Sequence, residues 1–149
     1  MRIKLLTYLE EAEAPYLNTI VRLRTPRKAI TVKALIDTGS PRTIIAYSEA
    51  IMLQIPINSL IKEDIIRLGG SVYEARVYNK LKILFKSEDN QLVIEEMPVQ
   101  VLKPTSPKEA MEQKFGFIIG MDFLKEKKYK LFCDISKDVA YLEKNNSEN

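Results

Sequence analysis

The sequence contains no histidine, no tryptophan and a single cysteine, Cys133, among its 149 residues. The absence of histidine excludes Ser-His-Asp and Cys-His nucleophile pairs and HExxH zinc sites. One thiol cannot supply the tetrahedral ligand set of an all-cysteine zinc site, and it cannot close an intrachain disulfide. Any chemistry near neutral pH would therefore depend on carboxylates, lysines, tyrosines or hydroxyl groups.

Long apolar runs and a strong net charge are also missing. No stretch of about 18 apolar residues is present, which predicts no membrane span, and residues 1–14 lack the apolar core of a signal peptide. The formal net charge is +3 with both signs interspersed, which argues against a nucleic-acid partner. Together with the lone cysteine, these features lead us to expect a cytoplasmic protein.

The sequence does contain 46% hydrophobic residues, arranged in short segments that prolines, glycines and polar loops separate. This length and pattern predict one domain over residues 1–143, followed by a flexible polar tail over residues 144–149. Two short helices are expected over residues 48–53 and 121–127. The many short strands favour an all-β fold over α/β. Strands are expected over residues 2–9, 16–23, 29–36, 43–46, 65–68, 72–77, 80–85, 92–101, 117–119, 129–135 and 139–142.

The sharpest local feature is residues 34–40, with the sequence ALIDTGS. An apolar strand leads into Asp37, the Thr38 hydroxyl can hold a neighbouring backbone group, and Gly39 has no Cβ and so allows a ligand or second chain to approach. Taken alone, this tripeptide also fits an ordinary Asx turn at the end of a strand. Its interpretation therefore depends on a second feature of the chain.

That second feature is residues 117–124, with the sequence FIIGMDFL, about eighty residues after Asp37. Three hydrophobic residues precede Gly120 and an expected helix. Taken alone, this pattern fits any strand–turn–helix junction.

In combination the two features, with the Gly69-Gly70 hairpin between them, resemble the retroviral-type aspartic proteases (retropepsins) and their cellular relatives. The resemblance covers roughly residues 15–143, and its motifs occur in the family's order. It implies an all-β closed barrel, one half of the acid-protease fold, which forms a homodimer and needs neither cofactor nor metal. By this resemblance the catalytic residue is Asp37, the active-site loop continues through Thr38, Gly39 and Ser40, the flap tip is Gly69 and Gly70, and the strand and turn that brace the loop are Ile118, Ile119 and Gly120.

Three departures from the viral pattern limit what the resemblance implies. Pro41 and Arg42 stand where viral enzymes often carry acids, so the subsite and dimer ion pairs of those enzymes do not transfer. Met121 stands where viral members often place an arginine. The loop over residues 104–114 is longer than in minimal viral forms.

The chain carries one Asp-Thr/Ser-Gly motif, whereas aspartic-protease chemistry needs two facing carboxylates that share a proton. The hypothesis therefore requires a symmetric homodimer with Asp37 of each copy on the two-fold axis. Its substrate would be an extended peptide that pairs as an added strand. The strands over residues 2–9 and 139–142 are the expected inter-subunit sheet.

Two other interpretations remain open at this stage. One is a catalytically inactive dimer of the same fold that acts as a peptide-binding or assembly module. The other is a β-barrel with no site, a monomer in which Asp37 lies exposed on a turn. Cys133 lies in the apolar segment LFCDI and is expected to be a buried thiol.

Overall fold

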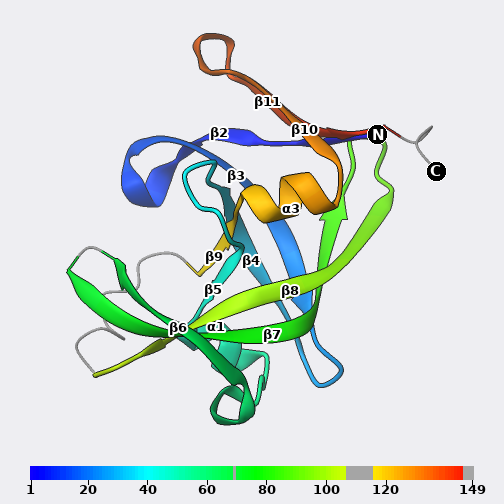
Figure 1. Ribbon diagram of the computed structural model, residues 1–149. Helices are drawn as coiled ribbons and strands as arrows, with labels where there is room; N and C mark the ends of the chain where they lie inside the picture. The colour runs from blue at the N-terminus through cyan, green and yellow to red at the C-terminus, as the bar shows by residue number, and fades with distance from the viewer. Residues whose placement is uncertain (69, 107–115, 146–149) are drawn as a thin grey trace.

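A computed structural model describes residues 1–68, 70–106 and 116–145 of the chain. It confirms the expected all-β architecture, because two sheets account for most of the described residues and the helices are short (Figure 1). The helices are α1 (Tyr47–Met52) and α3 (Met121–Glu126), with 3₁₀ turns η1 (Glu10–Ala12), η2 (Ile57–Ser59) and η3 (Ile135–Lys137). No helix of the described segments is long and apolar enough to cross a membrane.

The larger sheet has eight strands and closes on itself. Its order is β2-β3-β4-β9-β5-β8-β7-β6, and an additional pairing of β3 with β7 joins two distant members. Closure leaves few free edges, which suits a chain with so many short strands. The strands are β2 (Leu6–Leu9), β3 (Ala14–Arg24), β4 (Ala29–Ile36), β5 (Ile44–Ala46), β6 (Ile61–Leu68), β7 (Ser71–Lys86), β8 (Leu92–Pro104) and β9 (Phe117–Ile119).

The barrel interior is filled by aliphatic side chains and three aromatic rings that pack in a row. Phe85 and Phe123 have ring centroids 5.6 Å apart, and Phe123 stacks on Tyr129 at 5.2 Å. Phe123 is fully buried and lies on α3, so this row ties α3 to β7 and to β10 (Tyr129–Asp134). Burial of such rings is the main stabilising contribution of each.

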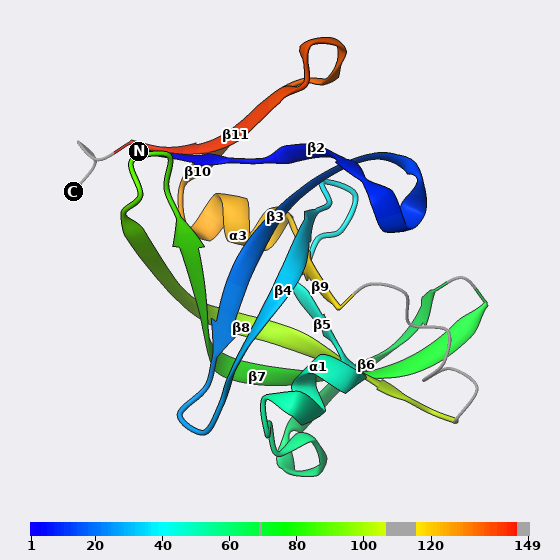
Figure 2. The same cartoon turned by 180° about the vertical axis from the view of Figure 1, so that it is seen from behind.

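The short strand β9 lies between β4 and β5 (Figure 2). It runs parallel to β4, with Ile36 opposite Ile119, and antiparallel to β5, with Ile45 opposite Phe117. Because parallel strands cannot be joined by a tight turn, the chain must leave β4 and return much later. The loop after β4 is thereby placed directly beside the turn after β9.

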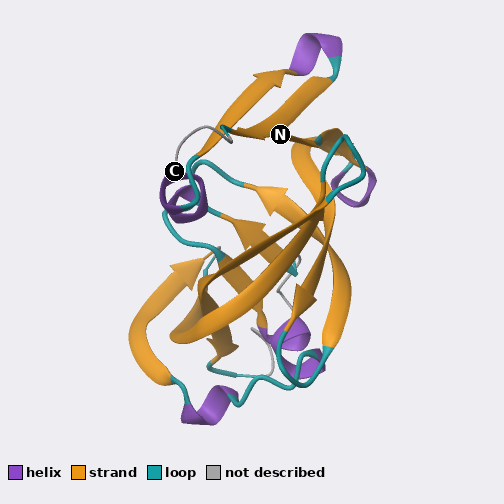
Figure 3. Ribbon diagram, turned by 90° about the vertical axis from the view of Figure 1, so that its right-hand side faces the viewer, coloured by secondary structure: helices purple, strands orange, loops and turns teal. Residues whose placement is uncertain are grey.

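The smaller sheet has the order β1-β11-β10, with β1 (Arg2–Lys4), β10 (Tyr129–Asp134) and β11 (Val139–Lys144). The β10–β11 hairpin projects away from the barrel (Figure 3). Cys133 is exposed on this hairpin, so the expectation of a buried thiol is wrong. The LFCDI segment suggested burial, but the projecting hairpin keeps this position in solvent.

Strand β11 has both of its edges paired within the chain. It lies between β1, where Ile3 faces Leu142, and β10, where Leu131 also faces Leu142. The expectation that residues 139–142 pair with a second chain is therefore wrong, because a strand has two edges and both are in use. β11 also extends to Lys144, whose ammonium group contacts the Glu95 carboxylate at 3.0 Å.

Several element boundaries differ from those expected. The strand over residues 2–9 is interrupted at Leu5, whose amide donates to the Ala140 carbonyl at 3.0 Å. The segments 72–77 and 80–85 form one strand, β7, with an irregular register between Tyr78 and Leu81. A register irregularity of this kind bends a strand without ending it.

Candidate active site

Asp37 directly follows β4 and has an exposed side chain. Its amide donates to the Ile119 carbonyl at 3.0 Å, so β9 fixes its backbone. The Gly39 amide donates to Asp37 Oδ1 at 2.9 Å, and the other carboxylate oxygen has no hydrogen-bond partner among the described residues. One oxygen is therefore held by the loop while the other is available to solvent or to a ligand.

The loop after Asp37 is a closed turn. The Ser40 amide donates to the Asp37 carbonyl at 3.1 Å, and Ser40 Oγ donates to the Arg42 carbonyl at 2.7 Å. Thr38 and Gly39 are exposed at the tip of this turn. The Thr38 side chain is therefore accessible directly next to Asp37 in the chain.

Gly120 lies against the back of this loop so closely that no side chain fits. A Cβ atom at this position would stand 2.3 Å from the Arg42 carbonyl oxygen and 2.7 Å from the Ser40 carbonyl oxygen. The next amide, that of Met121, donates to the Ser40 carbonyl at 2.8 Å. A glycine is required here because the obstructing atoms are backbone atoms, which cannot rotate away.

Thr43 and Asp122 form a buried polar link between the loop and α3. The Thr43 hydroxyl donates to Asp122 Oδ1 at 2.7 Å, and the Thr43 amide donates to Asp122 Oδ2 at 3.1 Å. The same hydroxyl accepts a bond from the Gly120 amide at 3.2 Å. Every polar atom of the fully buried Thr43 side chain is therefore used, which makes the link rigid and costly to break.

The sequence alone did not identify this link. Asp122 stood out only as part of the 117–124 motif, and Thr43 only as the start of a strand. The available signal was an acid in the first turn of an expected helix. An acid in this position does not indicate its partner, because Thr43 lies 79 residues away in the sequence. Only the strand order brings the two residues into contact.

The structure brings together most of the residues expected at the site. Ile119 and Gly120 contact the loop that carries Asp37, and Ile118 lies between Leu35 of β4 and Ile44 of β5. Ile44 and Ile118 are half-buried and thus add apolar surface beside the loop.

The last pair of the β6–β7 hairpin among the described residues is Leu68 with Ser71, on either side of the expected glycine pair. Gly70 has a φ of 85°, a left-handed conformation that favours glycine. Gly69 lies outside the described residues.

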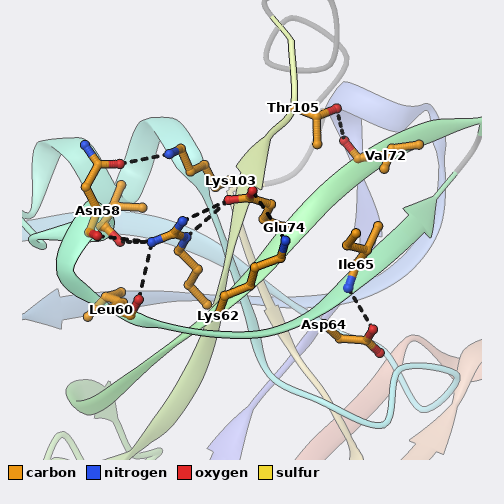
Figure 4. Close-up of polar contacts among 11 residues, drawn as sticks. Asn58, Leu60, Lys62, Asp64, Ile65, Val72, Glu74, Lys103 and Thr105 are labelled. Atoms are coloured by element: carbon orange, nitrogen blue, oxygen red, sulfur yellow. Dashed lines mark hydrogen bonds and ion pairs between the residues drawn. The ribbon is translucent and has the colours of Figure 1, made fainter.

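The base of this hairpin is anchored by Arg76, on β7. Arg76 Nη1 donates to the carbonyl oxygens of Ile57, Asn58 and Leu60 at 3.2–3.3 Å, around the η2 turn. Its Nη2 contacts Glu74 Oε2 at 3.1 Å (Figure 4). This hydrogen bond from Arg76 lowers the pKa of the Glu74 carboxyl below its ordinary value, with smaller contributions from nearby cations.

A small apolar cluster joins the same hairpin to the site. Tyr73, Ala75 and Leu102 are buried together, and the half-buried Ile44 and Ile66 pack against them. Ile44 belongs to β5, which begins directly after Thr43. The hairpin packs against Ile44 of β5, and the loop that carries Asp37 leads directly into β5. The same strand therefore supports both.

A cavity of about 720 Å³ lies elsewhere, between β3, β7 and β8. Its lining includes Arg24, Tyr78 and Glu96 and none of residues 37–42. In the single chain the Asp37 carboxylate therefore lies on an open face and not at the bottom of this cavity.

No protein-family model matches the chain, and no curated protein matches it. Several solved structures do resemble the chain in fold. A retropepsin-like aspartic protease from Rickettsia conorii has a TM-score of 0.61 at 13% identity, covering 95% of this chain and 90% of that one. The retroviral protease-like domain of Ddi1 from Leishmania major has a TM-score of 0.50 at 15% identity, covering 87% and 97%. EIAV protease, solved with the inhibitor HBY-793, has a TM-score of 0.50 at 18% identity, covering 86% and 100%.

These likenesses, with β9 placed between β4 and β5, define the fold as that of the retropepsin-like aspartic proteases. The resemblance inferred from the sequence motifs is thereby confirmed at the level of fold.

Proposed function

We propose that this chain is an aspartic endopeptidase that acts as a homodimer, with Asp37 of each copy forming the catalytic pair. The observation that carries the proposal is the exposed Asp37 carboxylate, held by Gly39 and braced from behind by Gly120, in a retropepsin-like fold. The chain has one such motif. A second copy must therefore supply the second carboxylate.

The proposed reaction follows from two carboxylates about 3 Å apart, which cannot both ionise. The charged member takes a proton from a water molecule as it attacks the peptide carbonyl, and the protonated member donates to the carbonyl oxygen. Asp37 Oδ1 stays bonded to the Gly39 amide, which leaves the other oxygen for this exchange. Because one proton must be retained, we expect activity to be greatest on the acid side of neutrality.

The proposed substrate is an extended peptide that lies between the paired loops and two flaps, each a β6–β7 hairpin tipped by Gly69 and Gly70. An extended peptide satisfies its backbone by pairing as an additional strand. The half-buried Ile44 and Ile118 flank the loop and favour hydrophobic side chains next to the scissile bond. Thr38, exposed beside Asp37, is the proposed grip on the other subunit's loop.

We also propose a cytoplasmic location for this enzyme. The chain has a single cysteine, Cys133, and so no intrachain disulfide, which fits a reducing compartment.

The decisive experiment compares the wild-type chain with Asp37→Asn on an unfolded protein between acidic and neutral pH. Asparagine keeps a carbonyl oxygen for the Gly39 amide, so the fold and the oligomeric state should be unchanged. We expect the cleavage rate to fall at least about a hundredfold, because the acid–base pair is lost.

Three outcomes would count against the proposal. Retention of both activity and pH profile in Asp37→Asn would show that another residue does the chemistry. A strict monomer by sedimentation under active conditions would exclude the shared site. Peptides that bind to the wild-type dimer and remain uncut would favour a binding module.

A further inference from the structure

We propose that the outer face of the barrel where β3, β7 and β8 lie side by side is a docking site for an acidic amphipathic helix of a partner protein. β3 and the last part of β7 run next to each other here (Figure 2). The two hollows on this face are lined by none of residues 37–42. The docking site is therefore separate from the loop that carries Asp37, and its role would be the same in an active or an inactive chain.

The register of the strands decides which side chains point outward. Leu23 of β3 pairs with Ile83 of β7, and both are fully buried in the barrel interior. Because successive side chains of a strand alternate between its two faces, the next pair, Arg24 and Lys82, points to the outside. Lys82 in turn pairs with Glu96 of β8. These last three residues therefore form a row across the outer face.

A second row lies next to the first along the same strands. Arg22 pairs with Leu84, and Leu84 pairs with Ile94 of β8. Leu84 is shielded from solvent, yet it does not belong to the interior core cluster, because its side chain lies on the outside of the barrel among its neighbours there. The two rows, with the adjoining pair Lys86 and Leu92, form what we call the basic face.

Positive charge on the basic face is not balanced within the described part of the chain. Arg24 lies directly opposite Lys82, and like charges in this arrangement destabilise a sheet. Arg22 and Lys86 add two more cations, and none of these four side chains forms an ion pair among the described residues. Glu96 is the only acid of the basic face. Carboxylates of a partner would relieve this repulsion, and a guanidinium group can bind a carboxylate with two parallel hydrogen bonds.

The basic face also exposes large apolar side chains, and it is hollowed. Leu92 is 65% exposed and Ile94 is 46% exposed. Leu84 and Leu92 line a hollow of about 320 Å³, and Arg24 and Lys82 line the cavity of about 720 Å³ described above. Exposed apolar side chains gathered within a polar rim are typical of a protein–protein contact. Hollows of this size receive side chains, which a partner protein presents and a lipid surface does not.

The partner segment must satisfy its own backbone hydrogen bonds. Residues 22–24 of β3 pair with β4 on one edge and with β7 on the other, and residues 82–84 of β7 pair with β3 and with β8. These residues leave no strand edge open, so a partner cannot add here as a further strand. A helix bonds its own backbone and presents side chains alone. A helix with a stripe of glutamates beside a stripe of leucines therefore complements both the cations and the apolar surface of the basic face.

The test measures the fluorescence anisotropy of a labelled, alanine-based helical peptide of about 18 residues. The peptide carries one stripe of glutamates and one adjoining stripe of leucines, and its counterpart has glutamine in place of each glutamate. We expect the wild-type chain to bind the glutamate peptide at least about tenfold more tightly than its counterpart at low ionic strength, and the difference to fall on adding salt.

Variants of the chain locate the binding to the basic face. Arg24→Glu should weaken binding of the glutamate peptide at least about fivefold, and it should keep the fold, because it places opposite charges on paired strands beside Lys82. Leu92→Ser should weaken binding of both peptides, because it removes exposed apolar surface. The control Lys125→Glu, at an exposed position of α3, makes the same change in net charge and should leave binding unchanged. Asp37→Asn should also leave it unchanged, which separates this inference from the proposed function.

Binding of neither peptide, equal binding of both, or binding that survives Arg24→Glu would overturn the inference. Two further measurements test other occupants of the basic face. If vesicles of phosphatidylserine and phosphatidylcholine bind the wild-type chain but not Arg24→Glu, while the peptide does not bind, the face is a membrane contact. If sedimentation shows an oligomer that Arg24→Glu dissociates, the face is a contact between copies of this chain. Either result would replace the partner helix.

Discussion

At the scale of single residues, the site depends on the absence of a side chain at Gly120 as much as on the presence of a carboxylate at Asp37. The loop and the turn after β9 touch through backbone atoms. Such close approach transmits the position of one segment to the other without a flexible side chain between them.

Gly120→Ala should destabilise the chain by about 2–4 kcal/mol, because its Cβ would lie 2.3 Å from the Arg42 carbonyl oxygen and force the two segments apart. The measurement is chemical denaturation. The matched control is Gly70→Ala, which meets no atom within 4 Å but has a φ of 85°, and should cost about 1 kcal/mol. Gly120 has a φ of −98°, which any residue adopts, so a cost at Gly120→Ala no larger than at Gly70→Ala would contradict the close contact as its cause.

Some of this residue-level detail could be predicted from the sequence and some could not. An acid, a hydroxyl and a glycine directly after an apolar strand indicate a site through local chemistry alone. The bonds of Thr43 to Asp122 could not be predicted, because they join segments that only the tertiary fold brings together. The anchoring role of Arg76 was not predicted, since three of its acceptors are backbone carbonyls around η2 that leave no trace in the sequence.

At the scale of elements, the β6–β7 hairpin is held at its base and left open at its tip. Arg76 bonds three carbonyl oxygens around η2 and the Glu74 carboxylate, whereas Ile65, closer to the tip, exposes its side chain. This anchor fixes the point at which the proposed flap leaves the barrel.

Glu74→Gln should weaken this anchor in a pH-dependent way. The pKa of Glu74 is lowered in the folded chain by the Arg76 hydrogen bond, so ionised Glu74 stabilises the fold above its ordinary value of 4.5. That contribution is lost only as the pH falls through the lower folded value. Wild type should therefore be more stable than Glu74→Gln near pH 6, and the difference should disappear in stronger acid.

Thermal unfolding of both chains across this pH range provides the measurement, with Glu63→Gln as a control on the neighbouring strand. A stability difference that stays constant down to strong acid would contradict the assigned role of the Glu74 charge.

Element types were largely predictable from the sequence, whereas their ends were not. The alternation of apolar residues indicated most strands of the barrel. The continuation of β7 through residues 78–79 was missed, because a register irregularity and a turn carry similar polar residues. The helix α1 begins at Tyr47 and not at Ser48, and its N-cap is Ala46 without a side-chain bond.

At the scale of the whole molecule, the barrel and the β1-β11-β10 sheet are complete within one chain. The outer strands of the smaller sheet are β1 and β10, and the Glu88 amide already donates to the Arg2 carbonyl of β1 at 2.8 Å, so the proposed second copy would add at β10 or through the loops around Asp37. The fold class could be predicted because many short motifs agree. The strand edges that remain open to a partner could not be predicted, because they depend on the position of β11 between β1 and β10.

Dilution should therefore separate folding from activity. We expect the far-ultraviolet circular dichroism of the chain to persist at concentrations where the activity per chain has fallen, because the fold needs no partner and the proposed site does. Sedimentation over the same range should show dissociation in parallel with the loss of activity. Activity per chain that stays constant while the protein is monomeric would contradict a shared site.

The open position of Asp37 in the single chain has a consequence for how such an enzyme would be governed. If the proposed dimer is the active form, each newly made copy would be inert, and at low abundance the rate of proteolysis would grow with the square of the amount synthesised. The concentration of the chain would then control its activity. A cell would keep the enzyme inactive by holding the concentration low and activate it by raising synthesis.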